Sequence, residues 1–308
     1  MTATWSFINS PELNGKVAVI TGANSGLGFE TARALRQKGA TVVMACRSED
    51  KAQAAIAKLE TSAMGPAPEF VQLDLEDLAS VARAAATITE AHPAVDFLIN
   101  NAGVMGLRGP DGAQRQLNAN YLGHVALTAA LLPAVEKAGG RIVMLSSNLH
   151  RRGKLNKETP LDLSKQSPAI AYGSTKLADL LFCFEGDRRL RATRSAASIR
   201  AAHPGWSRSE LASKGPVEGR GAFMKKTAAL IGSNLGQKTE RGALPTLRAA
   251  LDPSIPSGSY VGPAGFMEMW GEPKTVGASK LANDQELGKA VFDAGLAAVG
   301  ATWPDSDS

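Results

Sequence analysis

The sequence predicts an α/β protein built on a doubly wound, parallel sheet of about seven strands with helices on both faces. Short apolar runs alternate strictly with longer stretches of helical spacing, and this alternation is typical of parallel strands joined by helical crossovers. The run at 16–20 also leads straight into a glycine-rich turn and then a helix, as the first strand of such a sheet does.

The chain is long enough for one large domain. It has 308 residues, of which 44% are hydrophobic and 20% are charged, an ordinary composition for a globular protein. The sequence contains no internal repeat and no linker that would divide it. We therefore expect a single domain over 13–302, preceded by an N-terminal extension at 1–12 and followed by a tail at 303–308.

The individual elements follow from the same patterns. Strands are expected where the chain has a short and mostly apolar run, at 16–20, 40–46, 69–73, 95–99, 141–145, 196–202 and 258–262. Helices are expected where apolar residues recur with helical spacing, at 29–38, 49–63, 76–91, 114–138, from about 168 onward, at 240–251 and at 283–299. Residues 148–168 are polar, and we expect them to cross the surface.

A looser stretch at 206–239 follows the sixth expected strand. Several glycines surround a short amphipathic piece at 222–231. A mobile segment beyond the carboxyl end of a strand is suited to close over a substrate, so we expect a substrate lid here. The apolar face of 222–231 could instead rest on a membrane surface.

Charge and cysteine content exclude several classes of function. The net charge is +5 and the pI is near 9.2, but the basic residues are spread along the chain without interleaved aromatic residues, so we expect no nucleic-acid partner. Cys46 and Cys183 are too few for a disulfide framework, and the four histidines are dispersed, so we expect no metal site. The chain has no signal-peptide pattern and no apolar run of membrane-spanning length, which favours a cytoplasmic protein.

The glycine-rich turn runs from Thr21 to Gly28 with the spacing Gly-x-x-x-Gly-x-Gly. Such a turn directs the free N–H groups and the positive end of the next helix toward one point, and the missing side chains let a phosphate come close. We therefore expect the turn to bind the pyrophosphate of a cofactor through Gly22, Asn24, Ser25, Gly26, Leu27 and Gly28. A glycine turn with a purely structural role is the alternative.

Arg47 stands at the end of the second expected strand, about 20 residues beyond the turn. A dinucleotide-binding domain reads the adenosine ribose at this place, where an acidic residue favours NAD(H) and a basic one accommodates the 2′-phosphate of NADP(H). Cys46 occupies the position of the acid. A guanidinium–phosphate contact contributes about 1.5–3 kcal/mol, so we expect NADP(H). Alternatively, Arg47 could be a surface residue at the start of the next helix that binds no ligand.

The third and fourth expected strands also end in residues that suit a ligand. Asp74 and Leu75 follow the third strand, where Asp74 could cap the next helix or accept a hydrogen bond from an adenine amino group. Asn101, Ala102 and Gly103 follow the fourth strand. Open parallel sheets bind ligands at the carboxyl ends of their strands.

Tyr172 and Lys176 are candidates for proton chemistry, because residues four apart on a helix share one face. Ser146 and Ser147 follow the fifth expected strand, and His203-Pro204-Gly205-Trp206 follows the sixth. Tyrosine and lysine at this spacing are also common on helices where they have no catalytic role. Ser147 could likewise have a purely structural role as a cap at the end of its strand.

Taken together and in order, the glycine turn, Asn100-Asn101-Ala102-Gly103, Asn120, Ser147, Tyr172-x-x-x-Lys176 and Pro204-Gly205 resemble the short-chain dehydrogenase/reductase superfamily over roughly residues 13–262. Within it, Ala45-Cys46-Arg47, Ser146-Ser147-x-x-His150, the long insertion before Tyr172 and His203-Pro204-Gly205 resemble the retinol dehydrogenase and protochlorophyllide reductase branch. The resemblance implies a Rossmann-type fold and an NAD(P)(H)-dependent activity.

The resemblance also implies roles for single residues. Tyr172 would be the general acid/base, Lys176 would lower the pKa of Tyr172 and bind the cofactor ribose, and Ser147 would donate to the substrate carbonyl. Asn120 would support a water-linked proton relay. Ser147 is preferred to Ser146 because the family's serine aligns with the second of such a pair. The remaining cofactor contacts would come from Pro204, Gly205, Ser207 and Ser209, and Ser209 stands where the family usually has threonine.

We therefore expect an NADP(H)-dependent oxidoreductase that interconverts a carbonyl and an alcohol. Apolar residues near the expected lid suggest an apolar substrate resembling a retinoid, steroid or lipid, although they could equally be ordinary packing; they are Trp206, Phe223, Met224, Leu230, Ile231, Phe266, Met267, Met269 and Trp270. An NADPH-dependent carbon–carbon double-bond reductase and a non-catalytic NADP(H) sensor are the alternatives. A homodimer could form through the helices of 114–138 and 169–192, as is frequent in the family.

Overall fold

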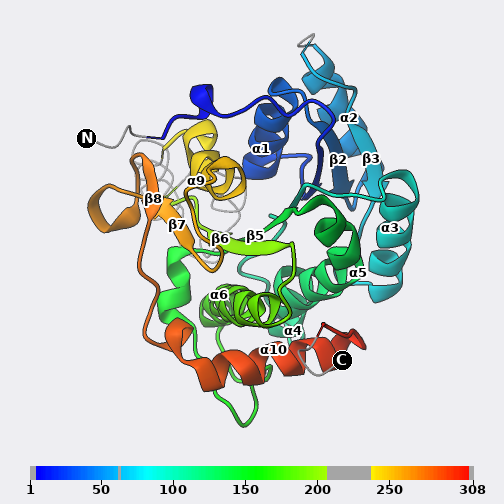
Figure 1. Cartoon of the computed structure of the whole chain (residues 1–308). Coiled ribbons are helices and arrows are strands. Elements are labelled where there is room, and N and C mark those ends of the chain that lie inside the picture. Colours follow the sequence, from blue (N-terminus) through cyan, green and yellow to red (C-terminus); the bar gives the residue numbers. More distant parts are fainter. Residues whose placement is uncertain (1–4, 62–63, 207–236, 305–308) are drawn as a thin grey trace, which may run out of the picture.

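The computed structural model describes residues 5–61, 64–206 and 237–304. Within them, eight strands form one sheet in the order β3-β2-β1-β4-β5-β6-β7-β8 (Figure 1). The strands are β1 Val17–Thr21, β2 Thr41–Cys46, β3 Glu69–Gln72, β4 Phe97–Asn100, β5 Arg141–Leu145, β6 Ser198–Ala202, β7 Tyr260–Pro263 and β8 Pro273–Thr275. The neighbours from β3 to β7 pair in parallel, and β8 pairs with β7 in the antiparallel sense. The predicted doubly wound sheet is confirmed, with one strand more than the seven expected.

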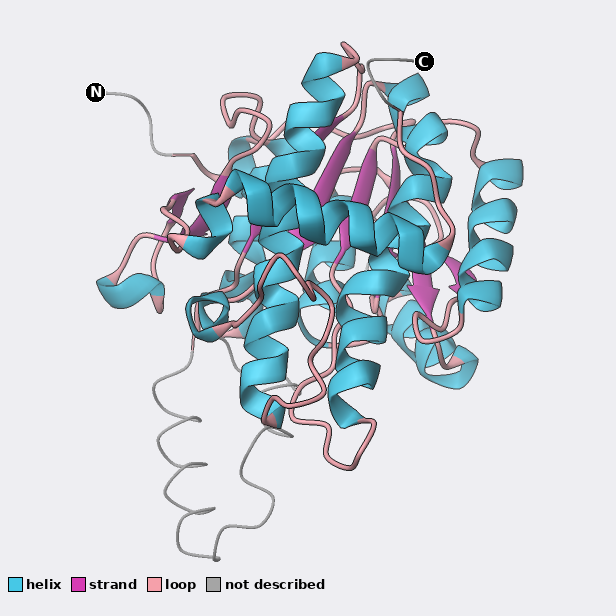
Figure 2. Cartoon of the chain, turned by 90° about the horizontal axis from the view of Figure 1, so that it is seen from below, coloured by secondary structure: helices cyan, strands magenta, loops and turns pink. Residues whose placement is uncertain are grey.

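Helices cover both faces of the sheet (Figure 1). They are α1 Gly26–Gln37, α2 Glu49–Glu60, α3 Leu78–Ala91, α4 Gly112–Leu117, α5 Gly123–Ala138, α6 Pro168–Ala192, α9 Thr239–Leu251 and α10 Gln285–Val299. Residues of α1, α2 and α9 belong to one hydrophobic cluster, and residues of α3, α5, α6 and α10 belong to another. Figure 2 views the molecule from below, where the helices of the second cluster lie in front of the strands.

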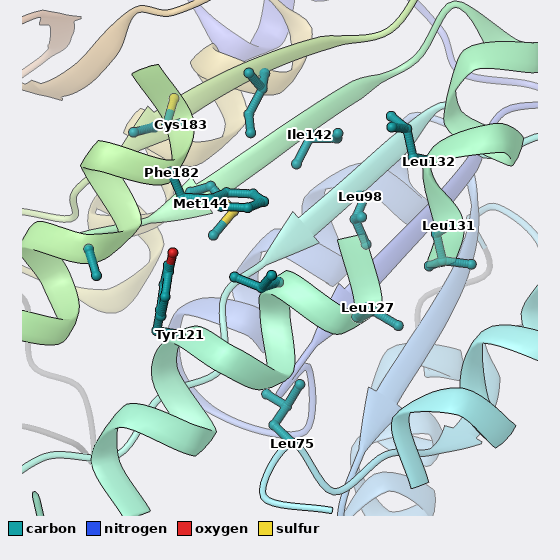
Figure 3. Close-up of a cluster of buried hydrophobic side chains, with 14 of the residues drawn as sticks. Leu75, Leu98, Tyr121, Leu127, Leu131, Leu132, Ile142, Met144, Phe182 and Cys183 are labelled. Carbon is teal, nitrogen blue, oxygen red and sulfur yellow. The ribbon is translucent and has the colours of Figure 1, made fainter. Parts of the chain in front are cut away.

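The alternation of side chains along β1 connects the two clusters. Val19 belongs to the cluster on the α5 and α6 side, and its neighbours Ala18 and Ile20 belong to the other, because successive side chains of a strand point to opposite faces. Both faces of the central strands are therefore buried, which explains their nearly continuous apolar sequence. Figure 3 shows part of the cluster between the sheet and α5 and α6, including Leu98, Leu127, Ile142, Met144 and Phe182.

The helix expected at 114–138 is divided into three pieces. The α4 helix ends at Leu117, a π-helical segment spans Asn118–Leu122, and α5 begins at Gly123. A single π-helical turn inside a longer helix changes the direction of the side chains that it carries, and such turns occur frequently at functional sites. Asn120 lies in the middle of this turn.

The α6 helix is buried almost all round, because α10 lies across its outer side (Figure 1). The rings of Phe182 in α6 and Phe292 in α10 stack with their centres 4.7 Å apart. Trp303 packs edge-on against both rings, so the packed part of the chain reaches at least to this residue. The hydroxyl of Tyr121 donates to the carbonyl oxygen of Val291 at 2.9 Å and adds a polar link between α10 and the π-helical segment.

Candidate active site

The site lies where the strand order reverses. The chain leaves β1 toward β2 and β3 on one side, and β4 begins the other half of the sheet immediately next to β1. In open α/β sheets, ligands bind at the carboxyl ends of the strands at this reversal. The glycine turn follows β1, and Asn101-Ala102-Gly103 follows β4, so the structure brings these two predicted segments together.

The backbone of the turn requires glycine at several positions. Gly22 and Gly26 have φ angles of +65° and +57°, in the left-handed region that glycine adopts without strain. A Cβ atom at Gly28 would lie 2.5 Å from both the side-chain nitrogen of Asn101 and the backbone oxygen of Gly22. The α1 helix begins at Gly26, and the Ser25 side chain does not cap it. The first N–H groups of α1 have no partner within the helix, which suits a phosphate.

Thr21 ties the turn to the segment after β4. Its Oγ1 accepts hydrogen bonds from the backbone N–H groups of Asn101 and Ala102, each at 2.9 Å. The Asn101 side chain donates in return to the Thr21 carbonyl oxygen at 2.8 Å. The Thr21 hydroxyl also lies 2.9 Å from Nε2 of His124, which brings α5 into the same network.

His124 is neutral in this network. Its Nδ1 lies 2.9 Å from the carbonyl oxygen of Asn120; since a carbonyl can only accept, Nδ1 carries the proton and Nε2 accepts from Thr21. Burial lowers the pKa of His124 to about 3. The residue therefore links the glycine turn to Asn120 without a charge.

The side chain of Asn120 is fully used in holding neighbouring backbone. Its Oδ1 accepts from the Val104 N–H at 2.7 Å, and its Nδ2 donates to the Val104 carbonyl at 2.9 Å and to Oγ1 of Thr175 at 3.0 Å. The backbone at Gly103 lies close to the Asn120 side chain: a Cβ atom on Gly103 would be 3.3 Å from Oδ1. Asn120 thus positions the loop after β4, and its part in a proton relay stays a prediction.

Tyr172 and Ser147 meet in the structure. Ser147 follows β5, and its hydroxyl accepts from the Leu149 N–H at 3.2 Å. Hydrogen bonding by the Ser147 hydroxyl is among the influences that lower the pKa of the Tyr172 phenol. The neighbouring Ser146 donates instead to the carbonyl oxygen of Lys176 at 2.8 Å. Of the two serines, Ser147 is therefore the one that shares its site with the Tyr172 hydroxyl.

Lys176 lies one turn after Tyr172 on α6, with its Nζ 5.9 Å from the centre of the Tyr172 ring. The ammonium donates to the carbonyl oxygen of Leu145 and to Oδ2 of Asp179, both at 2.8 Å. A Cβ atom at Gly103 would lie 3.9 Å from Nζ, so the lysine also borders the loop after β4. One of its N–H groups remains for a further acceptor.

Burial raises the pKa of Tyr172 above its ordinary value, and this influence outweighs the others. The charge of Lys176 and the hydrogen bond with Ser147 lower the pKa, whereas the charge of Asp179 raises it. The lysine therefore acts in the expected direction. With these residues alone the pKa of the phenol stays above its ordinary value, so a further positive charge close to the hydroxyl would favour the phenolate.

Arg47 lies at the end of β2 with its side chain 65% exposed. Among the described residues its acidic partner is Glu76 at 3.7 Å, and Glu76 is held more closely by Arg115 at 2.8 Å. Arg47 and Asp74 border the same cavity of about 500 Å³. A weakly paired guanidinium at the rim of a cavity is available to an anionic ligand.

Asp74 does not cap the helix that follows it, contrary to one of its two predicted roles. The α3 helix begins at Leu78, and Asp77 accepts from the Ala79 N–H at 2.9 Å as its cap. Asp74 instead closes a local turn by accepting from the Glu76 N–H at 3.0 Å. The turn places the first helical residue later than the sequence pattern indicated. Leu75 beside it is buried.

Pro204 and Gly205 follow β6 and lie beneath the loop after β7. Gly205 has a φ angle of +66°, and a Cβ atom on it would lie 2.5 Å from the carbonyl oxygen of Met269. Its N–H donates to Nδ1 of His203 at 3.2 Å. Ser207, Ser209 and all of the expected lid except Trp206 and 237–239 lie outside the described residues.

Comparisons with known proteins agree with this geometry. A family model described as short chain dehydrogenase matches residues 16–158. Retinol dehydrogenase 12 of Mus musculus is 32% identical over 298 residues, which cover 95% of this chain and 89% of the relative. Polyprenol dehydrogenase of Mus musculus is 32% identical over 307 residues, covering 96% and 88%. The crystal structure of an uncharacterised protein from Mycobacterium Paratuberculosis is similar with a TM-score of 0.78 and 36% identity, covering 98% of this chain and 100% of that one.

The chain is a short-chain dehydrogenase/reductase. It belongs to the retinol dehydrogenase-like branch, as the resemblance in its sequence indicated, and it is an oxidoreductase of carbonyl and alcohol groups that uses a nicotinamide cofactor. No helix in the described part of this short-chain dehydrogenase is long and apolar enough to cross a lipid bilayer.

His124 and Asp179 belong to the site of this short-chain dehydrogenase, although the sequence analysis did not select them. Asp179 lies three residues after Lys176 and His124 lies four residues after Asn120, spacings at which side chains on a helix are neighbours. That spacing was the available signal. It is weak without the fold, because a helix has many such pairs.

Proposed function

We propose that this short-chain dehydrogenase uses NADP(H) to interconvert an apolar alcohol and the corresponding aldehyde or ketone. The observation that carries the proposal is the meeting of the Tyr172 and Ser147 hydroxyls beside the reversal of the strand order. One of these hydroxyls can exchange a proton with a substrate oxygen while the other donates a hydrogen bond to it.

The residues at the reversal fit a dinucleotide. The free N–H groups of the turn and of the start of α1 would hold its pyrophosphate, Lys176 would hold the ribose next to the nicotinamide, and Pro204 and Gly205 would border the nicotinamide itself. The bound cofactor supplies or accepts the hydride. The Tyr172 phenolate would gain further stabilisation from the positive charge of the oxidised cofactor.

In reduction, the Tyr172 hydroxyl donates its proton to the substrate oxygen as negative charge develops there. Ser147 donates a hydrogen bond to the same oxygen and stabilises that charge. In oxidation, the Tyr172 phenolate takes the proton from the substrate hydroxyl. Lys176 stabilises this phenolate through its positive charge, in the direction that the structure gives for their interaction.

The preference for NADP(H) over NAD(H) rests on Arg47. It stands at the carboxyl end of β2 with an exposed and weakly paired guanidinium, and Cys46 replaces the carboxylate that would bind the free ribose of NAD(H). A 2′-phosphate would gain a charge-assisted hydrogen bond at this position.

Two observations support an apolar substrate. The relatives named retinol dehydrogenase 12 and polyprenol dehydrogenase carry the names of apolar alcohols. In this chain, Phe266 and Met267 are each 71% exposed, and the Asn148 side chain holds their loop near the Ser147 segment through a bond of 3.2 Å to the Met267 carbonyl. Exposed apolar side chains close to the proposed catalytic residues fit an apolar substrate.

Cofactor titration followed by a substrate panel tests the proposal. Wild-type protein should bind NADPH more tightly than NADH, and it should then reduce long-chain or polyisoprenoid aldehydes faster than short, polar ones. Arg47→Asp should weaken NADPH binding about 10- to 100-fold and leave NADH binding nearly unchanged. The matched control is Arg83→Asp, because Arg83 borders the same cavity and is 71% exposed but lies on α3.

Equal losses in the two variants would attribute the effect to general charge and contradict the role of Arg47. Failure to bind either nucleotide would contradict the cofactor site. A preference for polar carbonyls would contradict the proposed substrate class and leave the cofactor assignment intact.

A further inference from the structure

A fully buried ion pair adjoins the proposed catalytic residues. Lys176 is 3% exposed and Asp179 is 1% exposed, and Nζ of the lysine donates to Oδ2 of the aspartate at 2.8 Å. The second oxygen of Asp179, Oδ1, has no hydrogen-bond partner among the described residues. Charges removed from water in this way are stable only while each retains its partner.

Lys176 has no other charged neighbour of opposite sign in the described part of the chain. The remaining titratable groups that face the pair come from three elements, namely Tyr172 and Cys183 of α6, Tyr121 of the π-helical segment and His124 of α5. Burial raises the pKa of the phenols and of the thiol and lowers that of His124. All four are therefore neutral near pH 7, and the negative charge comes from Asp179.

Burial and Asp179 have opposite effects on Lys176. Burial is the largest influence and lowers the pKa of the ammonium, while the charge and hydrogen bond of Asp179 contribute to raising it above the ordinary value. Burial also raises the pKa of Asp179, to about 6, so its carboxylate remains ionised at neutral pH. A fully buried lysine without a counter-charge can have a pKa as low as about 5–6.

We propose that Asp179 is a positioning residue for Lys176, whose carboxylate keeps the buried ammonium protonated and holds it beside Tyr172. The inference rests on the proposed function for the role of Lys176 in proton transfer. Without Asp179 the lysine becomes neutral near pH 7, and a neutral amine no longer lowers the pKa of Tyr172.

The ionisation of Lys176 can be measured without cofactor or substrate, by NMR of ¹⁵N-lysine-labelled protein between pH 7 and 10. Loss of the signal in Lys176→Met assigns it. In the wild type, Lys176 should stay charged throughout this range. In Asp179→Asn, which keeps the shape of the side chain and an acceptor oxygen, Lys176 should either be neutral already at pH 7 or lose its charge within the range, with at least about a 100-fold weaker affinity for its proton.

Asp187→Asn is the matched control. It makes the same change on the same helix to a buried aspartate that pairs with Arg191 at 2.9 Å, and it should leave the Lys176 signal unchanged. Asp179→Glu, which retains the charge, should restore a charged lysine wherever the longer side chain is accommodated. A purely structural role of Asp179 would change stability in the variant without moving the ionisation of Lys176.

The proposal is overturned if Lys176 titrates in Asp179→Asn as it does in the wild type. If Asp179→Asn does not fold, the wild type decides alone: a Lys176 that loses its charge well below pH 10 overturns the proposal, and one that stays charged supports it. None of these outcomes depends on which nucleotide or carbonyl the enzyme uses. The failure of this inference is therefore distinct from a failure of the proposed function.

Discussion

At the scale of single residues, His124 connects the parts of the site through two hydrogen bonds, of which the one accepted from Thr21 requires the neutral ring. It is 1% exposed and accepts from Thr21 while donating to the Asn120 carbonyl. Protonation would place a second donor opposite the Thr21 hydroxyl, whose own acceptor sites are taken by two backbone N–H groups. The cost of charging His124 in the folded protein is therefore high.

This cost predicts a pH dependence of stability. The pKa of His124 falls from 6.5 to about 3 on folding, so between these values the unfolded chain binds a proton that the folded protein does not. The free energy of unfolding should therefore fall as the pH falls below 6.5, with a contribution from His124 of about 1.4 kcal/mol per pH unit. Urea unfolding at pH 7, 6 and 5 measures the slope.

His124→Gln should remove this contribution, because glutamine offers a donor and an acceptor and does not titrate. The variant should lose less stability per pH unit than the wild type. The same slope in both proteins would show that His124 is not the group responsible. His150, whose pKa burial lowers to about 4, should maintain part of the slope in either protein.

At the scale of elements, α10 completes the core on the α6 side of the sheet. Phe292 is fully buried; its ring stacks on Phe182 and packs against Trp303, and the Arg189 guanidinium lies 4.4 Å from its centre. These contacts join α6 to α10 and to the segment that follows α10, both of which lie far from α6 in the sequence. The apolar and polar residues of α6 do not separate onto two faces of the helix. Contacts on its outer side therefore explain why α6 is stable as a helix.

Phe292→Ala should lower the free energy of unfolding by about 3–5 kcal/mol, because it removes a ring from a closely packed cluster. Phe266→Ala is the control with the same change at a side chain that is 71% exposed, and it should alter stability by no more than about 0.5 kcal/mol. Urea unfolding of both variants is the measurement. Similar effects at the two positions would mean that α10 does not pack as described.

Sequence patterns predicted most elements, because the central strands are buried on both faces and the helices between them are strongly periodic. They did not predict β8, since Pro273-Lys274-Thr275 is too short to show a period and two of its three residues are exposed. They also did not divide the helix expected at 114–138, because a single π-helical turn is too short to show as a break in the apolar pattern. Within that turn, Asn120 contacts Val104 and Thr175, which are distant in the sequence.

The site could be predicted in part for a similar reason. Glycines, a tyrosine and lysine four apart, and an arginine at a strand end have local signatures. The partner of Lys176 and the role of His124 depend on burial and on elements that meet only in the fold. Ser147 and Ser146 could be separated by alignment with the family, whereas the structure distinguishes them by the bond of Ser146 to the Lys176 carbonyl.

At the scale of the whole molecule, the packing of α10 bears on the oligomeric state. Pairing of two copies through 114–138 and 169–192 would need an open outer face on α6. Every residue of α6 from Ala171 to Cys183 is buried within the single chain, and α10 covers that face. A dimer through this face of α6 would have to displace α10, so the packing does not favour the homodimer that the family resemblance suggested.

We therefore expect a monomer, with a mass of 32.1 kDa in light scattering coupled to size-exclusion chromatography. The value should not change over a tenfold range of protein concentration. A stable dimer would have to use another surface. A dimer that dissociates when α10 is cross-linked to α6 would contradict the packing described, because it would show that the two copies pair through the face that α10 covers.

The central claim is that Tyr172 transfers the proton in a reaction whose cofactor binds independently of it. The most direct test is to measure NADPH binding and single-turnover carbonyl reduction in wild type and Tyr172→Phe, with Tyr121→Phe as the control that removes a hydroxyl bonded to α10. Tyr172→Phe should bind NADPH nearly as the wild type does and reduce its substrate at least about 100-fold more slowly, while Tyr121→Phe retains the wild-type rate. Reduction by Tyr172→Phe at the wild-type rate would contradict the account.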